Sequence, residues 1–410
     1  MTYLLQALVA CATTYLLILW MRGPAERFGL IDHPGGRKRH DVPTPLTGGL
    51  AITISLFVAL SFSLSAMGSY HALLAAVVVL AVIGLLDDRG KVFPRTKLGV
   101  QVLAAVLMTS LGNHFLHSLG DLFGRGPVDL MNWAIPLTVF ATVAVINAIN
   151  TFDGVDGLAG TLVLAILAYF AFFAWSVGDA NALKFLVVLI GALVGFLVFN
   201  VPLPWASARS FMGDTGSQVL GIVVAWFSIE FTQETTSAIP PVCMLWVVGV
   251  ILLDFFTVTM RRVIRRRNPA TPDRAHIHHL LMRRGFSPMQ TVLILALVNI
   301  TFGAIGTAGW LLGWPQHLMF AGFLAAGILY FGIFLFPARF MRLGRRSRQA
   351  PRLAEAQKGA GWGVATPGEV TPAEPLPLLD QGSRPALRQS PHRASRRRRP
   401  SGVHSRPPGA

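Results

Sequence analysis

Long runs of apolar residues recur over the first 340 residues, separated by short polar segments. Most runs are apolar on every side of a helix, which is typical of helices that contact lipid and one another. About 20 residues are needed to cross about 30 Å of hydrocarbon. The sequence therefore predicts an all-α integral membrane protein of about eleven transmembrane helices. The predicted runs are 2–20, 46–66, 71–86, 97–112, 131–149, 158–176, 182–201, 215–232, 240–260, 289–312 and 315–337.

The composition narrows the class of protein. Hydrophobic residues make up 53% of the 410 and charged residues 13%, whereas a soluble domain has about 25% charged residues. The mean hydropathy is +0.56, so a soluble enzyme is excluded. The only two cysteines, Cys11 and Cys243, lie in apolar runs, which excludes a disulfide-rich scaffold and a cysteine-rich zinc module.

The basic residues predict the orientation in the membrane. The formal net charge is +16, and all Lys and Arg except Arg125 and Lys184 fall in alternate loops or near the C-terminus. Because Lys and Arg accumulate in cytoplasmic loops, eleven helices place the N-terminus outside and the C-terminus in the cytoplasm. The same pattern indicates a lipid bilayer, and not nucleic acid, as the partner of the basic residues.

A change of composition divides the chain into two predicted parts. Residues 1–340 form the membrane domain, and 341–410 are rich in Pro, Gly, Ser and Arg. The second part has too few apolar residues to bury a core, so we expect a disordered basic cytoplasmic tail. Its run Arg396–Arg399 is consistent with a solvated tail or with contact to anionic lipid head groups.

The few carboxylates gather in three segments that the predicted orientation places on the cytoplasmic face. Asp87 and Asp88 follow the third run, Asp153 and Asp156 follow the fifth, and Asp214 precedes the eighth. Hard oxygen ligands beside a phosphate suit Mg²⁺, which takes one or two carboxylates and keeps several waters. The sequence therefore predicts a Mg²⁺-dependent phosphate site, with Mn²⁺ as the alternative ion.

Two of the three carboxylate segments also have a structural interpretation. The first pair could be interfacial charges that pair with Arg89 and Lys91. Asp214 could cap the eighth helix, and the amides and dipole of that helix N-terminus would attract a phosphate. The hypothesis that all three segments have only structural roles is less favoured.

The segment 261–288 adds eight arginines and a group of histidines. His276, His278 and His279 could contact a phosphate, bind zinc or belong to a structural turn, and we favour phosphate contact. Asp254 lies inside the ninth run, where a carboxylate is a functional hypothesis by default. We expect it to form a structural salt bridge with a basic residue.

Four motifs occur in a fixed order along the chain. They are Asp-Asp at 87–88, Asn-x-x-Asp-Gly-x-Asp-Gly at 150–157, Phe-Met-Gly-Asp-x-Gly-Ser at 211–217 and His-x-His-His at 276–279. Together they resemble the polyprenyl-phosphate N-acetylhexosamine-1-phosphate transferases over about residues 1–340. The segment Asp273–His279 is similar to the branch that uses UDP-GlcNAc. The histidine cluster of the muramoyl-pentapeptide branch has a different local form.

The resemblance implies an enzyme of the bacterial cytoplasmic membrane with its active site facing the cytoplasm. UDP-GlcNAc and undecaprenyl or decaprenyl phosphate would give GlcNAc-diphospho-polyprenol and UMP, with Mg²⁺, as the first membrane step of cell-envelope polysaccharide synthesis. The nearest alternative is a sister enzyme that uses UDP-MurNAc-pentapeptide or another UDP-HexNAc. A secondary transporter is a different class, and it would place its ionisable residues near the bilayer midplane. A homodimer is left open by the sequence.

The resemblance also implies roles for individual residues. It assigns Asp214 and Asn150 to the metal, Phe211 to stacking on uracil, and Lys91, His276 and Arg274 to substrate binding. The residues expected to be catalytic are Asp87, Asp88, Asp153, Asp156, His278 and His279. A phosphate monoester has its second pKa near about 6 and is already mostly dianionic at pH 7. We therefore favour direct in-line attack by the lipid phosphate over a covalent aspartyl intermediate.

Overall fold

The computed structural model describes residues 2–33, 42–202, 208–233, 239–266 and 276–335. The chain divides into two units, Met1–Pro351 and Arg352–Ala410. The predicted tail, 341–410, lies outside the described residues, and so does Arg274. All elements below belong to the first unit.

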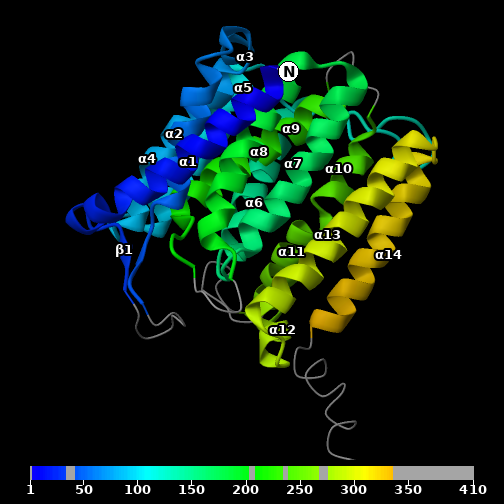
Figure 1. The fold of residues 1–410 in the computed structure, drawn as a ribbon. Coiled ribbons are helices and arrows are strands. Elements are labelled where there is room, and N and C mark those ends of the chain that lie inside the picture. The colour runs from blue at the N-terminus through cyan, green and yellow to red at the C-terminus, as the bar shows by residue number, and fades with distance from the viewer. Residues whose placement is uncertain (1, 34–41, 203–207, 234–238, 267–275, 336–410) are drawn as a thin grey trace, which may run out of the picture. The chain divides into compact units, whose positions relative to one another are not determined.

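Helices account for nearly all of the regular structure (Figure 1). They are α1 Thr2–Arg27, α2 Gly48–Leu60, α3 Leu64–Ser69, α4 His71–Asp88, α5 Pro94–Leu111, α6 Ala134–Phe152, α7 Leu158–Val177, α8 Ala180–Asn200, α9 Gly213–Gln233, α10 Pro241–Val247, α11 Gly249–Ile264, α12 Ile277–Arg283, α13 Pro288–Leu311 and α14 Gln316–Phe334. A short 3₁₀ helix, Met131–Trp133, precedes α6. The strands β1 Ile31–Asp32 and β2 Thr44–Pro45 pair antiparallel, with Ile31 opposite Pro45.

Each predicted apolar run coincides with a helix or a pair of helices. The run 46–66 is divided into α2 and α3, and the run 240–260 into α10 and α11, which meet at 76°. In the described part of the chain, seven helices are long and apolar enough to cross a membrane, or eight if the bent pair is one span. The all-α, multi-pass architecture is thereby supported, while the count of eleven and the orientation stay predictions.

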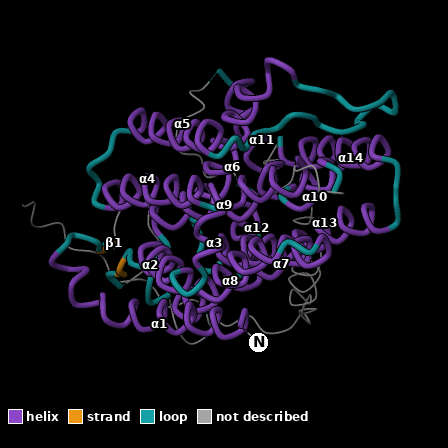
Figure 2. The backbone as a smooth tube through the Cα atoms, turned by 90° about the horizontal axis from the view of Figure 1, so that it is seen from above, coloured by secondary structure: helices purple, strands orange, loops and turns teal. Residues whose placement is uncertain are grey.

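Helix α9 lies in the middle of the bundle when the protein is viewed from above (Figure 2). It packs against α2, α4, α6 and α7. Glycines allow this packing to be close: a Cβ added to Gly49 would lie 2.1 Å from the nitrogen of Gly216, and one added to Gly84 would lie 2.5 Å from Cα of Thr215. The first turn of α9 therefore touches the backbones of α2 and α4, which brings the C-terminal end of α4 to it.

Candidate active site

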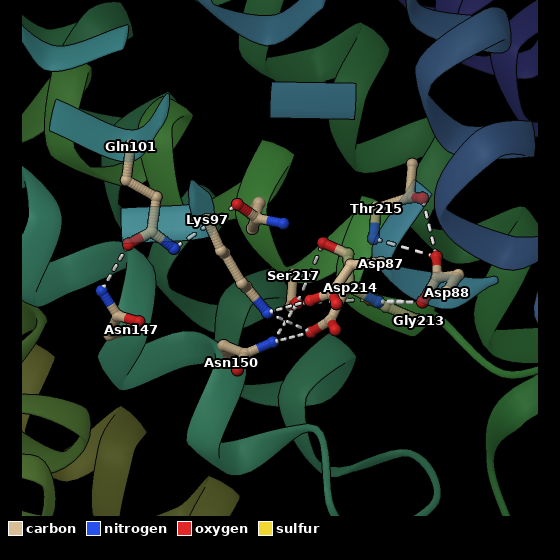
Figure 3. A network of polar contacts seen from close by, with 11 residues as sticks. Asp87, Asp88, Lys97, Gln101, Asn147, Asn150, Gly213, Asp214, Thr215 and Ser217 are labelled. Atoms are coloured by element: carbon tan, nitrogen blue, oxygen red, sulfur yellow. Dashed lines mark hydrogen bonds and ion pairs between the residues drawn. The ribbon is translucent and has the colours of Figure 1, made fainter. Parts of the chain in front are cut away.

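A lysine ammonium group joins two carboxylates where α4, α5 and α9 meet (Figure 3). The Nζ atom of Lys97 lies 2.9 Å from Oδ2 of Asp87 and 2.8 Å from Oδ1 of Asp214. The three side chains are mostly buried, with exposed fractions of 16%, 18% and 28% respectively. Sequence reasoning assigned no site role to Lys97. Its position in the first turn of α5 was the available signal, but nothing in the sequence distinguished it from the other basic residues nearby.

Asp88 has a different environment from Asp87, although the two are adjacent. Its Oδ1 accepts a hydrogen bond from the backbone nitrogen of Asp214 at 2.7 Å. Its Oδ2 accepts from the backbone nitrogen of Thr215 at 3.1 Å and from Oγ1 of Thr215 at 2.7 Å. Asp88 therefore caps the N-terminus of α9 from a different helix, using amides that would otherwise lack partners.

The contacts of Asp87 and Asp88 correct the two structural interpretations made from the sequence. Asp214 lies in the first turn of α9 and is not the residue that caps it. Asp87 pairs with Lys97, whereas Lys91 is exposed and forms no ion pair in this cluster. The guanidinium of Arg89 lies 5.9 Å from the ring centroid of Phe28.

The cap requires glycine at position 213. Gly213 has φ = +71°, and a Cβ there would lie 2.7 Å from Oδ2 of Asp88. An L side chain would thus be strained in this left-handed conformation and would also collide with the capping carboxylate. The glycine in the Phe-Met-Gly-Asp segment is explained by these two constraints.

Asn150, at the end of α6, holds Asp214 from the side opposite the cap. Its Nδ2 donates to Oδ1 of Asp214 and, at 2.8 Å, to Oγ of Ser217. The amide group is therefore directed at Asp214 as a donor. This geometry favours a positioning role for Asn150 over the metal-ligand role implied by the resemblance.

A second layer of polar side chains lies one helical turn deeper, below Lys97 and Asp214. Nδ2 of Asn147 donates to Oε1 of Gln101 at 2.8 Å, and Nε2 of Gln101 donates to Oε1 of Gln218 at 3.4 Å. Gln101 and Gln218 are buried. Buried amides that bond one another fix the relative rotation of α5, α6 and α9, because any rotation would leave them without partners.

The Asn-x-x-Asp-Gly-x-Asp-Gly segment adds further carboxyl groups to the site. Asp153 is the C-cap residue of α6. Burial, together with the charges of Asp214, Asp88 and Asp156, holds the pKa of Asp153 well above its usual range. The raised pKa favours the protonated, neutral form of Asp153, and a cation bound beside these carboxyl groups would favour its ionised form.

The donor set suits Mg²⁺ better than a metal with an all-protein cage. Among the residues that the structure describes, no three His, Cys, Asp or Glu side chains are arranged to hold a metal ion. Two carboxylates, Asp87 and Asp214, do lie together. Mg²⁺ usually takes one or two carboxylates and completes its shell with water and substrate phosphate, so these residues fit it. Zinc, which needs three or four protein ligands, is not favoured.

The histidine motif is held by Asp254, a buried carboxylate of α11. Nδ1 of His276 lies 2.6 Å from Oδ2 of Asp254. Oδ1 of Asp254 accepts from the backbone nitrogen of Ile277 at 3.0 Å and from the hydroxyl of Tyr330 at 2.8 Å. The basic partner expected for Asp254 is therefore His276, a member of the histidine motif. The same hydrogen bonds connect the start of α12 to α11 and α14.

His278 points toward the segment that follows α6. Its ring is 5.6 Å from that of Phe152 by centroids, and its Nε2 lies 3.6 Å from the place of a Cβ on Gly154. Burial, then the neighbouring His279, lowers the pKa of His278 to about 3, so its ring is neutral at pH 7. The ring of His279 follows at 4.3 Å from that of His278. The histidine motif and the Asp153 segment thus meet in space.

Phe211 lies at the edge of these groups, on the segment that enters α9. Its backbone nitrogen donates to the carbonyl of Pro45 at 2.9 Å, and its carbonyl accepts from the nitrogen of Gly48 at 3.0 Å. The side chain is half-buried. These contacts fix the backbone of the segment against β2 and α2, and they leave the predicted stacking role as a prediction.

Comparison with known proteins identifies the family. A family model described as glycosyl transferase family 4 matches residues 67–232, which span Asp87 to Asp214. An undecaprenyl-phosphate alpha-N-acetylglucosaminyl 1-phosphate transferase of Escherichia coli O157:H7 is 35% identical over 77% of this chain and 87% of its own length. The enzymes of the same name from Haemophilus influenzae and Yersinia pestis are 32% and 31% identical over 86% and 82% of this chain, and 100% and 93% of their own lengths. The chain therefore belongs to glycosyl transferase family 4, as the four motifs indicated.

Proposed function

We propose that the protein transfers GlcNAc-1-phosphate from UDP-GlcNAc to undecaprenyl phosphate, or a closely related polyprenyl phosphate, and releases UMP. The names of relatives 31–35% identical over most of the chain support the substrate pair. The observation that carries the proposal is the Asp87–Lys97–Asp214 cluster beside the first turn of α9. The reaction takes place at the cytoplasmic face of a bacterial cytoplasmic membrane.

Asp87 and Asp214 would hold Mg²⁺, which supplies neutralisation of the negative charge on the diphosphate. Lys97 remains beside them and offsets the charge of the lipid phosphate. Asn150 keeps Asp214 in place through its Nδ2. Asp88 acts on the site through α9 and not on the substrates, because both of its oxygens accept hydrogen bonds from the first turn of α9. It is a positioning residue, and Asp87 is the member of the pair that faces the substrates.

The chemical step is a direct displacement. An oxygen of the polyprenyl phosphate, already dianionic, forms a bond to the sugar-bearing phosphorus of UDP-GlcNAc. The bond from that phosphorus to the bridging oxygen breaks, and the electron pair leaves on UMP. No proton has to be removed from the nucleophile, so neither aspartate is needed as a general base. His278, neutral at pH 7, is available as a hydrogen-bond donor to phosphate through one ring nitrogen.

The test is UMP release by the purified protein in detergent with Mg²⁺ and undecaprenyl phosphate. UDP-GlcNAc and UDP-MurNAc-pentapeptide are supplied in parallel. We expect turnover of UDP-GlcNAc alone, with a loss of at least about 100-fold in Asp214→Asn. Asp121→Asn is the matched control, because Asp121 accepts from backbone amides in the segment between α5 and α6, away from the cluster.

Other outcomes would change the assignment. Turnover of the pentapeptide substrate would assign the protein to the sister branch. A stoichiometric burst of UMP without the lipid acceptor would replace direct displacement by a covalent aspartyl intermediate. Full activity after removal of divalent cations with EDTA would refute the role of Asp87 and Asp214 in holding Mg²⁺.

A further inference from the structure

A cavity of about 230 Å³ lies at the ends of α4 and α9 that are far from the carboxylate cluster. Helix α4 begins at His71 and ends at Asp88, and α9 passes from Asp214 to Glu230. At 1.5 Å per residue, both paths are about 25 Å long. Because the hydrocarbon of a bilayer is about 30 Å thick, the cavity lies near the opposite membrane face. It is lined, among others, by Tyr70, His71, His114, Asp179, Trp226 and Glu230.

A buried carboxylate forms one wall of this cavity. Glu230 is only 8% exposed. The hydroxyl of Tyr70 donates to its Oε1 at 2.6 Å, and Nε1 of Trp226 donates to its Oε2. Donors to both oxygens are the pattern expected for an ionised carboxylate held in place. A buried carboxylate near the end of α9 is therefore a candidate binding group.

A second carboxylate lines the cavity from the start of α8. Oδ1 of Asp179 accepts from the backbone nitrogens of Asn181 at 3.0 Å and Ala182 at 2.9 Å, so that Asp179 caps the helix. Its Oδ2 has no hydrogen-bond partner within the described residues. Asp179 therefore contributes a negative charge and one acceptor that the helix cap does not use.

His114 adds a further acceptor and no positive charge. Its ring stacks on the indole of Trp226 at 4.0 Å between centroids and 5° between planes. Its Nε2 lies 3.0 Å from the carbonyl of Trp226, so Nε2 carries the proton of this bond. Burial lowers the pKa of His114 to about 4, and the ring is neutral at pH 7 with a lone pair on Nδ1. The lining residues include no Lys or Arg.

We propose that this cavity binds a primary ammonium group on the membrane face opposite the active site. An ammonium group is a triple donor without an acceptor, and the cavity offers two carboxylates and an imidazole lone pair. The hydroxyl of Tyr70 and the indole nitrogen of Trp226 hold Glu230 in place at the cavity. The volume suits a small head group, since whole drug-sized solutes need cavities of about 300–1,000 Å³. The ammonium comes either from the ethanolamine head group of a lipid or from a free amine such as a polyamine.

The test uses the full-length protein in detergent, without nucleotide, and follows its melting temperature. Phosphatidylethanolamine, phosphatidylcholine and phosphatidylglycerol with identical acyl chains are titrated separately, and ethanolamine and spermidine are titrated without lipid. A ligand that binds only the folded state raises the melting temperature in a saturable way. We expect this response to the primary amines and not to phosphatidylcholine or phosphatidylglycerol.

Asp179→Asn is the informative variant. Asparagine caps helices as well as aspartate does, so the fold is kept while the negative charge is lost. We expect the apparent Kd for the primary amine to rise about tenfold or more, since hydrogen bonds to charged groups are the strong ones. Asp121→Asn is the matched control, because Asp121 also accepts two backbone amides but does not line the cavity. It should bind as the unaltered protein does.

The outcomes separate the two sources and decide the proposal. Saturable stabilisation by phosphatidylethanolamine alone identifies a lipid head group, and stabilisation by ethanolamine or spermidine without lipid identifies a free amine. An equal response to all three lipids with none to the free amines, or an unchanged Kd in Asp179→Asn, would overturn it. If Asp179→Asn does not fold, Trp226→Phe replaces it, and an unchanged Kd in that variant would equally overturn it.

Discussion

Asp87 and Asp88 are adjacent at the end of α4, but their substitution should have different effects on stability and activity. Asp88→Asn keeps one acceptor oxygen but replaces the other with an amide NH2 group, a donor that faces the donors of α9. A hydrogen bond to a charged group contributes about 1.5–3 kcal/mol, and an anion at a helix N-terminus about 0.3–1 kcal/mol. We therefore expect Asp88→Asn to lower the free energy of unfolding by about 2–4 kcal/mol.

Asp87→Asn should behave in the opposite way. Asp87 makes an ion pair with Lys97, which keeps its second partner Asp214 when Asp87 is altered. Because the Lys97 ammonium is not left without a carboxylate, the melting temperature should fall less than in Asp88→Asn. UMP release should nevertheless fall by at least about 100-fold, because a group that faces the transferred phosphate is lost.

The assay compares thermal unfolding and UMP release for both variants in the same detergent, with Asp121→Asn as the control. Asp88→Asn should melt several degrees below Asp87→Asn and retain more activity per folded molecule. Equal melting temperatures, or a fully folded Asp88→Asn with no activity, would refute the assignment of Asp88 to the cap and would make it a group that contacts substrate.

Three further outcomes follow from the same geometry. Gly213→Ala should lower stability by about 2 kcal/mol or more, as measured by thermal unfolding, whereas Gly178→Ala, also left-handed but with open space around it, should lose only about 1–2 kcal/mol. Lys97→Met should reduce the kcat of UMP release by about 100-fold or more, because it leaves two carboxylates without their shared cation. The unfolded chain protonates His278 near pH 6.5 while the folded chain resists it down to about pH 3, so stability should fall as pH drops through this range, and less steeply in His278→Gln.

The apolar runs were sufficient to predict the helices, because a helix in lipid must satisfy its own backbone and present apolar side chains. They could not predict the break between α10 and α11. No proline lies within 242–264, and the break at Val248 precedes Gly249, where a Cβ would lie 2.9 Å from the ring of Phe323. The bend thus accommodates a distant aromatic side chain, which is tertiary information.

The polar site was predictable as a group of residues but not as a set of roles. Successive residues on a helix point about 100° apart, so Asp87 and Asp88 face different neighbours, and the sequence does not say which one faces α9. The same limit applies to Lys91 and Lys97: both follow the Asp pair, and only the fold places Lys97 between two carboxylates. The hydrogen bonds of Asp254 to His276 and Tyr330 join segments far apart in the sequence, and no local pattern indicates them.

Helix α9 corresponds to the predicted run 215–232, but it is not among the candidate membrane spans of the structure. Of its 21 residues, 17 are buried, and they include Ser217, Gln218 and Glu230. A helix surrounded by protein need not present apolar side chains to lipid, so its polar residues lower its hydropathy below that of a lipid-exposed span. Since α9 packs between α4, α6 and α7, each a candidate span, we expect it to lie at membrane depth as well. Its polar residues then follow from its central position, with the carboxylate cluster at one end and the Glu230 cavity near the other.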